Sequence, residues 1–198
     1  VTWDLNPTDA NAPVGSSSFV YTSESHTITA FGFDNNNGAG TAHSLFFKND
    51  GGDEIGLGLT GTDHNELQIS NGTPLNFIQF DLRTILGQNA INGQIKVGSV
   101  QPSESFLLFG SNQLGTLGTQ LGSAYDSAFD LQFINLPDFG KYNFYSVAAG
   151  ADDVLPVALR AEFTPVPEMN ALFPIVGLIA AVASTHALRR RKLARAVV

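Results

Sequence analysis

The chain contains no cysteine, and charged residues make up only 14% of its 198 residues. Without cysteine it cannot be a disulfide-stabilised mini-protein, bind zinc through thiolates or use a cysteine nucleophile. Basic residues are scarce, with 10 Lys and Arg against 18 Asp and Glu and a formal net charge of −8. Because nucleic-acid binding depends on neutralising phosphates with Lys and Arg, this composition argues against a nucleic-acid partner. With 43% hydrophobic residues and 15 Phe, the chain still has enough apolar material for a folded core.

The charge is distributed unevenly along the chain. Residues 1–168 hold five basic residues and all 18 acidic residues, a net charge of −13. Residues 169–198 hold the other five basic residues and no acidic residue. The sequence therefore divides into an acidic body and a basic tail.

The tail carries an uncharged segment from Ala171 to Leu188. As a helix its 18 residues would measure about 27 Å, near the short end of what crosses a hydrocarbon core of about 30 Å. Pro174 falls in the first turn, where a missing N–H is tolerated. Directly after this segment come Arg189, Arg190, Arg191 and Lys192, with Arg195 completing a basic cluster over 189–195. We therefore expect a single transmembrane helix over about 171–188, with a cytoplasmic C-terminus and the acidic body across the membrane.

Three other interpretations of the tail are less favourable. A buried core helix would rarely end in four consecutive cations, and a signal peptide carries its charges before its apolar run, at the N-terminus. An amphipathic surface helix needs a polar face, whereas residues 171–183 are apolar on every side. Export of the body would require an N-terminal signal, and because the chain begins at Val1 we expect that such a signal has been removed.

The body, residues 1–163, is predicted to be an all-β, jelly-roll-like β-sandwich. Short β-rich runs alternate with turn sequences such as Asn71-Gly72 and Asn92-Gly93. The predicted strands are Thr2–Leu5, Ser18–Thr22, His26–Phe33, Ser44–Lys48, Glu66–Ile69, Asn76–Leu82, Gly93–Val100, Ser105–Gly110, Ala128–Asn135, Tyr142–Ala148 and Leu155–Phe163. About ten strands in one domain favour a sandwich, and only Asp81–Gly87 indicates a helical turn.

Apolar and polar residues alternate with period two at two places in the body, as in strands with one buried face. Leu131 and Phe133 alternate with polar residues in one run, and Val157, Leu159 and Ala161 do so in the other. Residues 164–168 follow as Thr-Pro-Val-Pro-Glu, which predicts an extended linker because two prolines lie in three positions.

The order of features at the C-terminus resembles a known sorting signal. Val166, Pro167 and Glu168 precede the apolar segment, and the Arg189–Lys192 cluster follows it. This order is similar to that of the PEP-CTERM protein-sorting tail, although Met169 stands where the usual motif repeats Pro. The resemblance covers about 30 residues and implies export, membrane retention by the tail, and cleavage near Pro-Glu by an exosortase. It also implies delivery to the cell surface or extracellular matrix in bacteria that produce exopolysaccharide.

Motifs of catalysis do not occur in the sequence. There is no Gly-x-Ser-x-Gly elbow, no His-Glu-x-x-His zinc motif and no phosphate-binding glycine loop. The acidic pairs Asp152-Asp153 and Asp53-Glu54 are neighbours in sequence, and side chains of strand neighbours point to opposite faces. A non-enzymatic protein is therefore expected, and a glycosidase or other hydrolase is the weakest hypothesis, since it needs two converging carboxylates.

Calcium is the favoured inorganic partner. Asp50, Asp53 and Glu54 place hard oxygen ligands on one glycine-containing loop, as a calcium site requires. The segment 34–38, Asp-Asn-Asn-Asn-Gly, is a second such loop. In both cases the same residues are also ordinary turn formers, so the sequence leaves a structural calcium site and a plain turn both open.

The leading hypothesis is thus a non-enzymatic exported surface or matrix protein that is sorted through its tail. The alternative is a carbohydrate-binding module that recognises exopolysaccharide, with calcium as an aid. Its stacking residues would come from the aromatic residues Trp3, Tyr21, Tyr125, Tyr142 and Tyr145. Core and cross-strand packing is the favoured explanation for the same aromatic residues.

Overall fold

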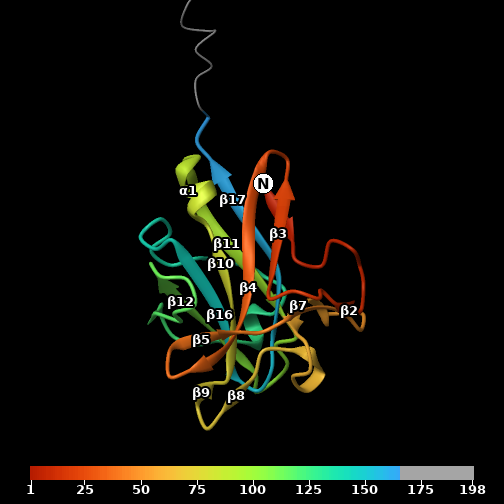
Figure 1. Ribbon diagram of the computed structural model, residues 1–198. Helices are drawn as coiled ribbons and strands as arrows, with labels where there is room; N and C mark the ends of the chain where they lie inside the picture. The colour runs from red at the N-terminus through yellow and green to blue at the C-terminus, as the bar shows by residue number, and fades with distance from the viewer. Residues whose placement is uncertain (166–198) are drawn as a thin grey trace, which may run out of the picture. The chain divides into compact units, whose positions relative to one another are not determined.

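The computed structural model describes residues 1–165, which form an all-β protein of antiparallel strands (Figure 1). Val1–Phe163 makes up one compact unit. Within residues 1–165, no helix is long and apolar enough to cross a membrane. The helix expected over about 171–188 and the basic cluster at 189–195 lie outside the described residues.

Most strands belong to two antiparallel sheets. The first sheet has the order β1 (Thr2–Asp4), β17 (Leu155–Phe163), β11 (Ala90–Gly98), β15 (Phe133–Asn135). The second sheet has the order β13 (Thr119–Gln120), β12 (Ser105–Ser111), β16 (Phe144–Ala151), β10 (Asn76–Asp81), β4 (His26–Asn36), β3 (Ser18–Ser23). At its margins β14 (Tyr125–Asp126) pairs with β12, and β5 (Ala39–Ala42) pairs with β4.

Smaller elements complete the body. A third sheet has the order β2 (Ala12–Pro13), β6 (Leu45–Asn49), β7 (Ile55–Leu59), and β8 (Ile69–Ser70) pairs with β9 (Thr73–Pro74). The helical segments are the α-helix α1 (Arg83–Gly87) and the 3-10 helices Asp63–Asn65 and Ser127–Phe129. The helical turn predicted from Asp81–Gly87 is therefore confirmed.

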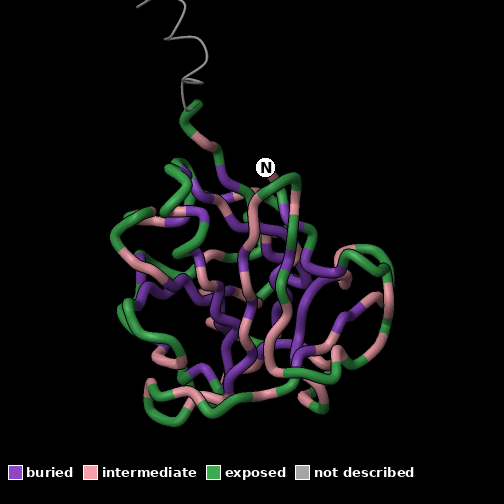
Figure 2. Tube along the Cα trace, turned by 45° about the horizontal axis from the view of Figure 1, so that its top comes forward, coloured by how far each residue is buried: buried purple, intermediate pink, exposed green. Residues whose placement is uncertain are grey.

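One hydrophobic core joins the two large sheets, so the body is a sandwich. Trp3, Leu159 and Ile95 come from the first sheet and Ile78 and Phe80 from the second, and all belong to one buried cluster. The Trp3 indole donates a hydrogen bond across to the His26 carbonyl at 3.1 Å. Figure 2 shows buried residues along the strands and exposed residues in the connecting loops. Because every member of this core among the described residues comes from Val1–Phe163, we expect residues 1–165 to fold by themselves.

Strand β10 is buried on both of its faces. Ile78 and Phe80 point into the main core, whereas Phe77 belongs to a second cluster with Phe33 and Phe109. Between them Gln79 is fully buried, because the loop after β12 covers it. The Gln79 side chain accepts a hydrogen bond from Gly115 N at 2.8 Å and donates one to Thr116 O at 2.9 Å. The loop thus provides the partners that a buried amide needs.

Several predicted strands end elsewhere in the structure. The prediction Glu66–Ile69 is wrong for most of its length, since only Ile69 enters a strand. The prediction Ala128–Asn135 is wrong before Phe133, where a 3-10 helix and turns replace the strand. Strand β7, with sequence Ile-Gly-Leu-Gly-Leu, was not predicted because glycine weakens strand signals. A Cβ on Gly58 would lie 1.7 Å from Asn65 O, so only glycine permits this close backbone approach.

The two alternating patterns have different outcomes. In β17, Leu159 and Ala161 are buried while Arg160 and Glu162 are exposed, as predicted. At the start of the same pattern the prediction is wrong, because Val157 is half-buried and Ala158 is buried. In the other pattern Leu131 is 41% exposed and has a left-handed φ of 53°, so it lies in a turn. The residue of this segment that enters the core is Ile134.

Candidate functional site

The loop predicted to bind calcium surrounds a lysine. Asp50, Asp53 and Glu54 lie in the turn that joins β6 to β7, next to Lys48 at the end of β6. Lys48 Nζ is 2.8 Å from Glu54 Oε2 and 3.5 Å from Asp50 Oδ2, and its side chain is 2% exposed. Asp53 is not among the ion-pair partners of this lysine, and its backbone carbonyl accepts a hydrogen bond from Ser99 N at 3.2 Å. The structure thus brings two of the three residues together around an ammonium group.

Glu66 is the deepest partner of Lys48. Its side chain is 2% exposed, and its Oε1 forms an ion pair with Lys48 Nζ. Burial raises the pKa of Glu66 to about 6, although the neighbouring ammonium acts in the opposite direction. Burial also lowers the pKa of Lys48, but the hydrogen bonds and charges of Glu54 and Glu66 outweigh it, so that this pKa lies above its usual value. A calcium ion at Asp50 and Glu54 would have to replace this ammonium, so these residues do not fit calcium while Lys48 is present.

A second group of carboxylates comes together nearby in the fold. Glu104, Asp152 and Asp153 each place one carboxylate oxygen within 4.8 Å of the others. His64 Nδ1 lies 3.0 Å from Asp153 Oδ2, and this hydrogen bond is the main reason why the pKa of His64 is raised. Burial, followed by the adjacent aspartates, raises the pKa of the partly buried Glu104. These three carboxylates offer the oxygen ligands that Ca²⁺ prefers.

Asp152 and Asp153 are not strand neighbours with side chains on opposite faces, so that prediction from the sequence is wrong. In the structure Asp152 has a left-handed φ of 56° and lies in the turn between β16 and β17, so both carboxylates reach the same group. An Asp-Asp pair between two strong strand predictions is a signal for such a turn.

The second predicted calcium loop is a hairpin turn between β4 and β5. Asn37 and Gly38 both have left-handed φ values, 54° and 91°, as a tight hairpin turn requires. Asn35 Oδ1 accepts a hydrogen bond from Gly38 N at 2.7 Å, and Asp34 Oδ1 lies 2.7 Å from His43 Nδ1. The oxygens of Asp34 and Asn35 therefore stabilise the turn.

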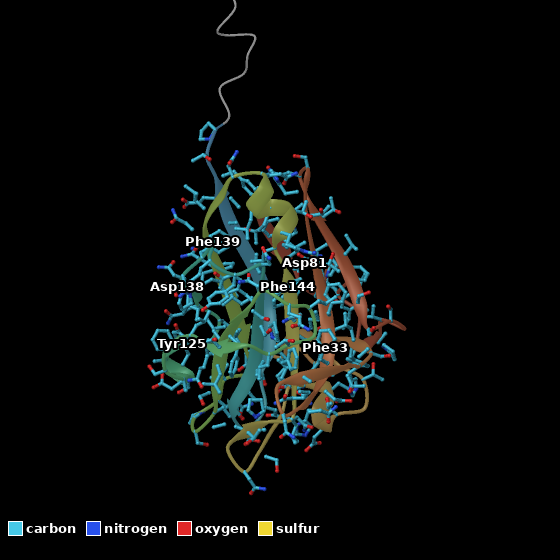
Figure 3. All side chains as sticks on the ribbon, turned by 60° about the vertical axis from the view of Figure 1, so that its left-hand side comes forward. Phe33, Asp81, Tyr125, Asp138, Phe139 and Phe144 are labelled. Carbon is cyan, nitrogen blue, oxygen red and sulfur yellow. The ribbon has the colours of Figure 1, made fainter. Side chains whose placement is uncertain are left out.

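The aromatic residues considered for sugar stacking serve mainly in packing. Trp3, Tyr21 and Tyr145 are buried, with no more than 3% exposure. Tyr125, labelled in Figure 3, stacks on Phe106 with ring centroids 5.1 Å apart, and Tyr142 meets Tyr145 edge-on at 6.0 Å. These contacts support the packing interpretation of the tyrosines.

The basic residues of the body fall into two groups. Lys48 is paired as described, Arg83 Nη2 is 2.7 Å from Asp81 Oδ2, and Lys141 Nζ is 2.9 Å from Asp138 Oδ2. Asp81 and Asp138 are labelled in Figure 3, where Asp81 lies near Phe144, its partner in the β10–β16 pairing. The remaining two basic residues of the body, Lys96 and Arg160, form no ion pair with any residue in the described part of the chain.

Lys96 and Arg160 lie together on the solvent-facing side of the first sheet. Lys96 Nζ is 4.7 Å from the centroid of the Phe133 ring, and Arg160 Cζ is 4.0 Å from the same centroid. Gln94 accepts a hydrogen bond from Arg160 Nε and donates one to Asn135 Oδ1 at 2.7 Å. Sequence reasoning missed this site because its members come from three separate strands.

Comparisons with protein-family models, with curated proteins and with solved structures gave no match. The resemblance of the tail to the PEP-CTERM signal therefore stays a prediction. Its residues, Val166-Pro167-Glu168 and Arg189-Arg190-Arg191-Lys192, lie outside the described residues.

Proposed function

We propose that this protein is a non-enzymatic exported β-sandwich that the C-terminal tail tethers and sorts to the cell surface or extracellular matrix. The order of features in the tail carries this proposal: Pro167-Glu168, the apolar segment 171–188, then the cluster Arg189–Lys192. The body supports it as a compact unit that ends at Phe163, immediately before the linker. An exosortase-type enzyme would recognise the Pro-Glu region, while membrane lipid surrounds the apolar segment.

The proposal includes a jelly-roll-like path of the chain through the sandwich. The chain passes directly from one large sheet to the other at five places: β10 to β11, β11 to β12, β14 to β15, β15 to β16, and β16 to β17. Such alternation between sheets is characteristic of Greek-key and jelly-roll proteins.

Localisation in a bacterial host tests the sorting proposal. The chain, preceded by a secretion signal, is expressed with and without an exosortase, and cell fractions are probed for the body. We expect full-length protein in the membrane without the enzyme and a shorter, released form with it. Deletion of 166–198 should release the body in both hosts. The double variant Pro167→Ala with Glu168→Ala should no longer be cleaved to the shorter form, whereas the linker variant Pro165→Ala should behave as the parent. If deleting 166–198 leaves the location unchanged, the sorting proposal is wrong.

Carbohydrate binding is the second candidate function. It is supported by the face that holds Lys96, Arg160 and Phe133, where cations, an aromatic ring and side-chain amides lie on one open sheet surface. Polar groups placed beside apolar surface are what sugar recognition requires, since sugars present both hydroxyl groups and C–H faces.

A further inference from the structure

We propose that the solvent-facing side of the first sheet binds a carboxylate-bearing polysaccharide, with Lys96 and Arg160 as the residues that bind its carboxylates. The proposal rests on the carbohydrate-binding candidate above and names its substrate class. It does not depend on how the tail is sorted.

Strand register places the residues of this site side by side. Thr2, Arg160, Gln94 and Asn135 are successive partners across β1, β17, β11 and β15. Two residues further along, Asp4, Ala158, Lys96 and Phe133 form a parallel row on the same face. The row between them, Trp3, Leu159, Ile95 and Ile134, is buried in the core. The site is therefore a continuous surface across all four strands, backed by a packed interior.

The electrostatics of this face indicate an anionic ligand. The body carries a large excess of acidic residues, yet Lys96 and Arg160 have no carboxylate partner among residues 1–165 and share a single ring. Two cations held close together repel each other, and a bound carboxylate would relieve that repulsion. The same face also carries two carboxylates, each of which accepts a hydrogen bond and keeps its charge: Asp4 accepts from Asn6 N at 2.9 Å, and Glu162 accepts from Asn92 at 2.8 Å. Neither lies within ion-pair distance of Lys96 or Arg160 in the described part of the chain.

The shape and the apolar lining favour a sugar over a simple anion. An open cleft of about 380 Å³ lies beside Lys96 and Phe133, and Asp4, Leu131 and Val157 contribute to its walls. Leu131 is 41% exposed and, with the Phe133 ring in the same cleft, offers apolar surface to the C–H face of a pyranose ring. Thr2, Gln94 and Asn135 add hydroxyl and amide groups at strand spacing, which suit the hydroxyl groups of consecutive sugars. An acidic peptide would make little use of this combination.

Binding to purified full-length chain in neutral detergent tests the proposal. The probes are oligogalacturonate as the carboxylated sugar, maltoheptaose as the neutral sugar and polyglutamate as an acidic polymer without sugar, each measured by isothermal titration. The test variant combines Lys96→Gln and Arg160→Gln. The matched control is Lys141→Gln, which removes an exposed cation that already has a carboxylate partner. A urea unfolding curve of each variant verifies that it folds.

We expect oligogalacturonate to bind the parent and the Lys141→Gln variant equally, and to bind the double variant at least about tenfold more weakly. Affinity of the parent should also fall as salt rises from about 50 mM to about 300 mM, a measurement that needs no variant. The proposal is overturned if oligogalacturonate does not bind, if maltoheptaose or polyglutamate binds as tightly, or if the double variant binds as the parent does. Because the tail is unchanged in every variant, these outcomes are separate from the localisation result.

Discussion

Lys48→Met tests whether the ammonium group holds the buried carboxylates in place. In the structure the side chains of Lys48 and Glu66 are each 2% exposed, and that of Glu54 is 32% exposed. Removing the cation leaves Glu66 as a buried carboxylate whose Oε2 already has no hydrogen-bond partner among the described residues. Breaking a buried pair in this way costs about 3–5 kcal/mol, a large part of a total stability of about 5–15 kcal/mol.

The dependence of this loss on pH follows from Glu66. Its pKa is raised to about 6 in the folded protein from an ordinary value of 4.5, so protonation favours the folded state as the pH falls through 6. In the variant the opposing effect of the ammonium is gone, so the pKa of Glu66 should rise further. The variant is therefore expected to be least stable at neutral pH and to regain stability relative to the parent toward pH 5.

Urea unfolding of residues 1–165 provides the assay. With a slope of about 2 kcal/mol per molar, the expected loss lowers the urea midpoint by about 1.5–2.5 M at neutral pH. Lys141→Met is the control, and its midpoint should match that of the parent because this cation is exposed. Adding Glu66→Gln to Lys48→Met should restore most of the stability, because it removes the uncompensated charge. A midpoint loss below about 0.5 M at neutral pH, or no recovery toward pH 5, would refute the reasoning.

Three further predictions follow from the loops and turns. Asp153→Asn should lower the pKa of His64, measured by NMR titration, because the Asp153 hydrogen bond is the main cause of its upward shift; an unchanged value would contradict this. Gly58→Ala should lower the free energy of unfolding in urea by at least about 2 kcal/mol, because its Cβ would collide with the backbone. The control Gly87→Ala has open space around its Cβ and should be neutral or stabilising, and equal effects of the two variants would contradict the close approach at Gly58. Millimolar calcium should raise the melting temperature of Lys48→Met more than that of the parent, because the loop carboxylates of the variant have lost their ammonium partner. Equal rises would show that the ammonium does not compete with calcium.

Local sequence was sufficient for the strands with strong β-forming patterns. Leu155–Phe163 was predicted with its observed bounds, and the strands around Ser18, Asn76 and Ser105 differ from prediction by one residue at an end. These segments combine β-branched and aromatic residues with clear turn signals at their ends, so the information lies within a few neighbouring positions. Strand β7 lacks that information, because its glycines are explained only by the backbone that packs against them.

The candidate sites depended much less on local sequence. Asp50 and Glu54 were predicted to be calcium ligands, but the cation they meet is Lys48, whose burial cannot be deduced from the loop itself. Glu104 meets Asp153 only because β12 and β16 pair, and Arg160 meets Phe133 only because β11 lies between their strands. Such encounters between distant residues are set by strand register.

By itself, the sequence determined the all-β class, the absence of disulfides, the uneven charge and the tail on which the sorting proposal rests. The tertiary structure decided which charged groups have partners. Hydrophobic burial selects one pairing of the strands. That pairing then determines which polar side chains become neighbours on the outer faces of the sheets. For this reason the tertiary structure placed Lys48 among carboxylates, and placed Lys96 and Arg160 together on an open sheet with no ion-pair partner among residues 1–165.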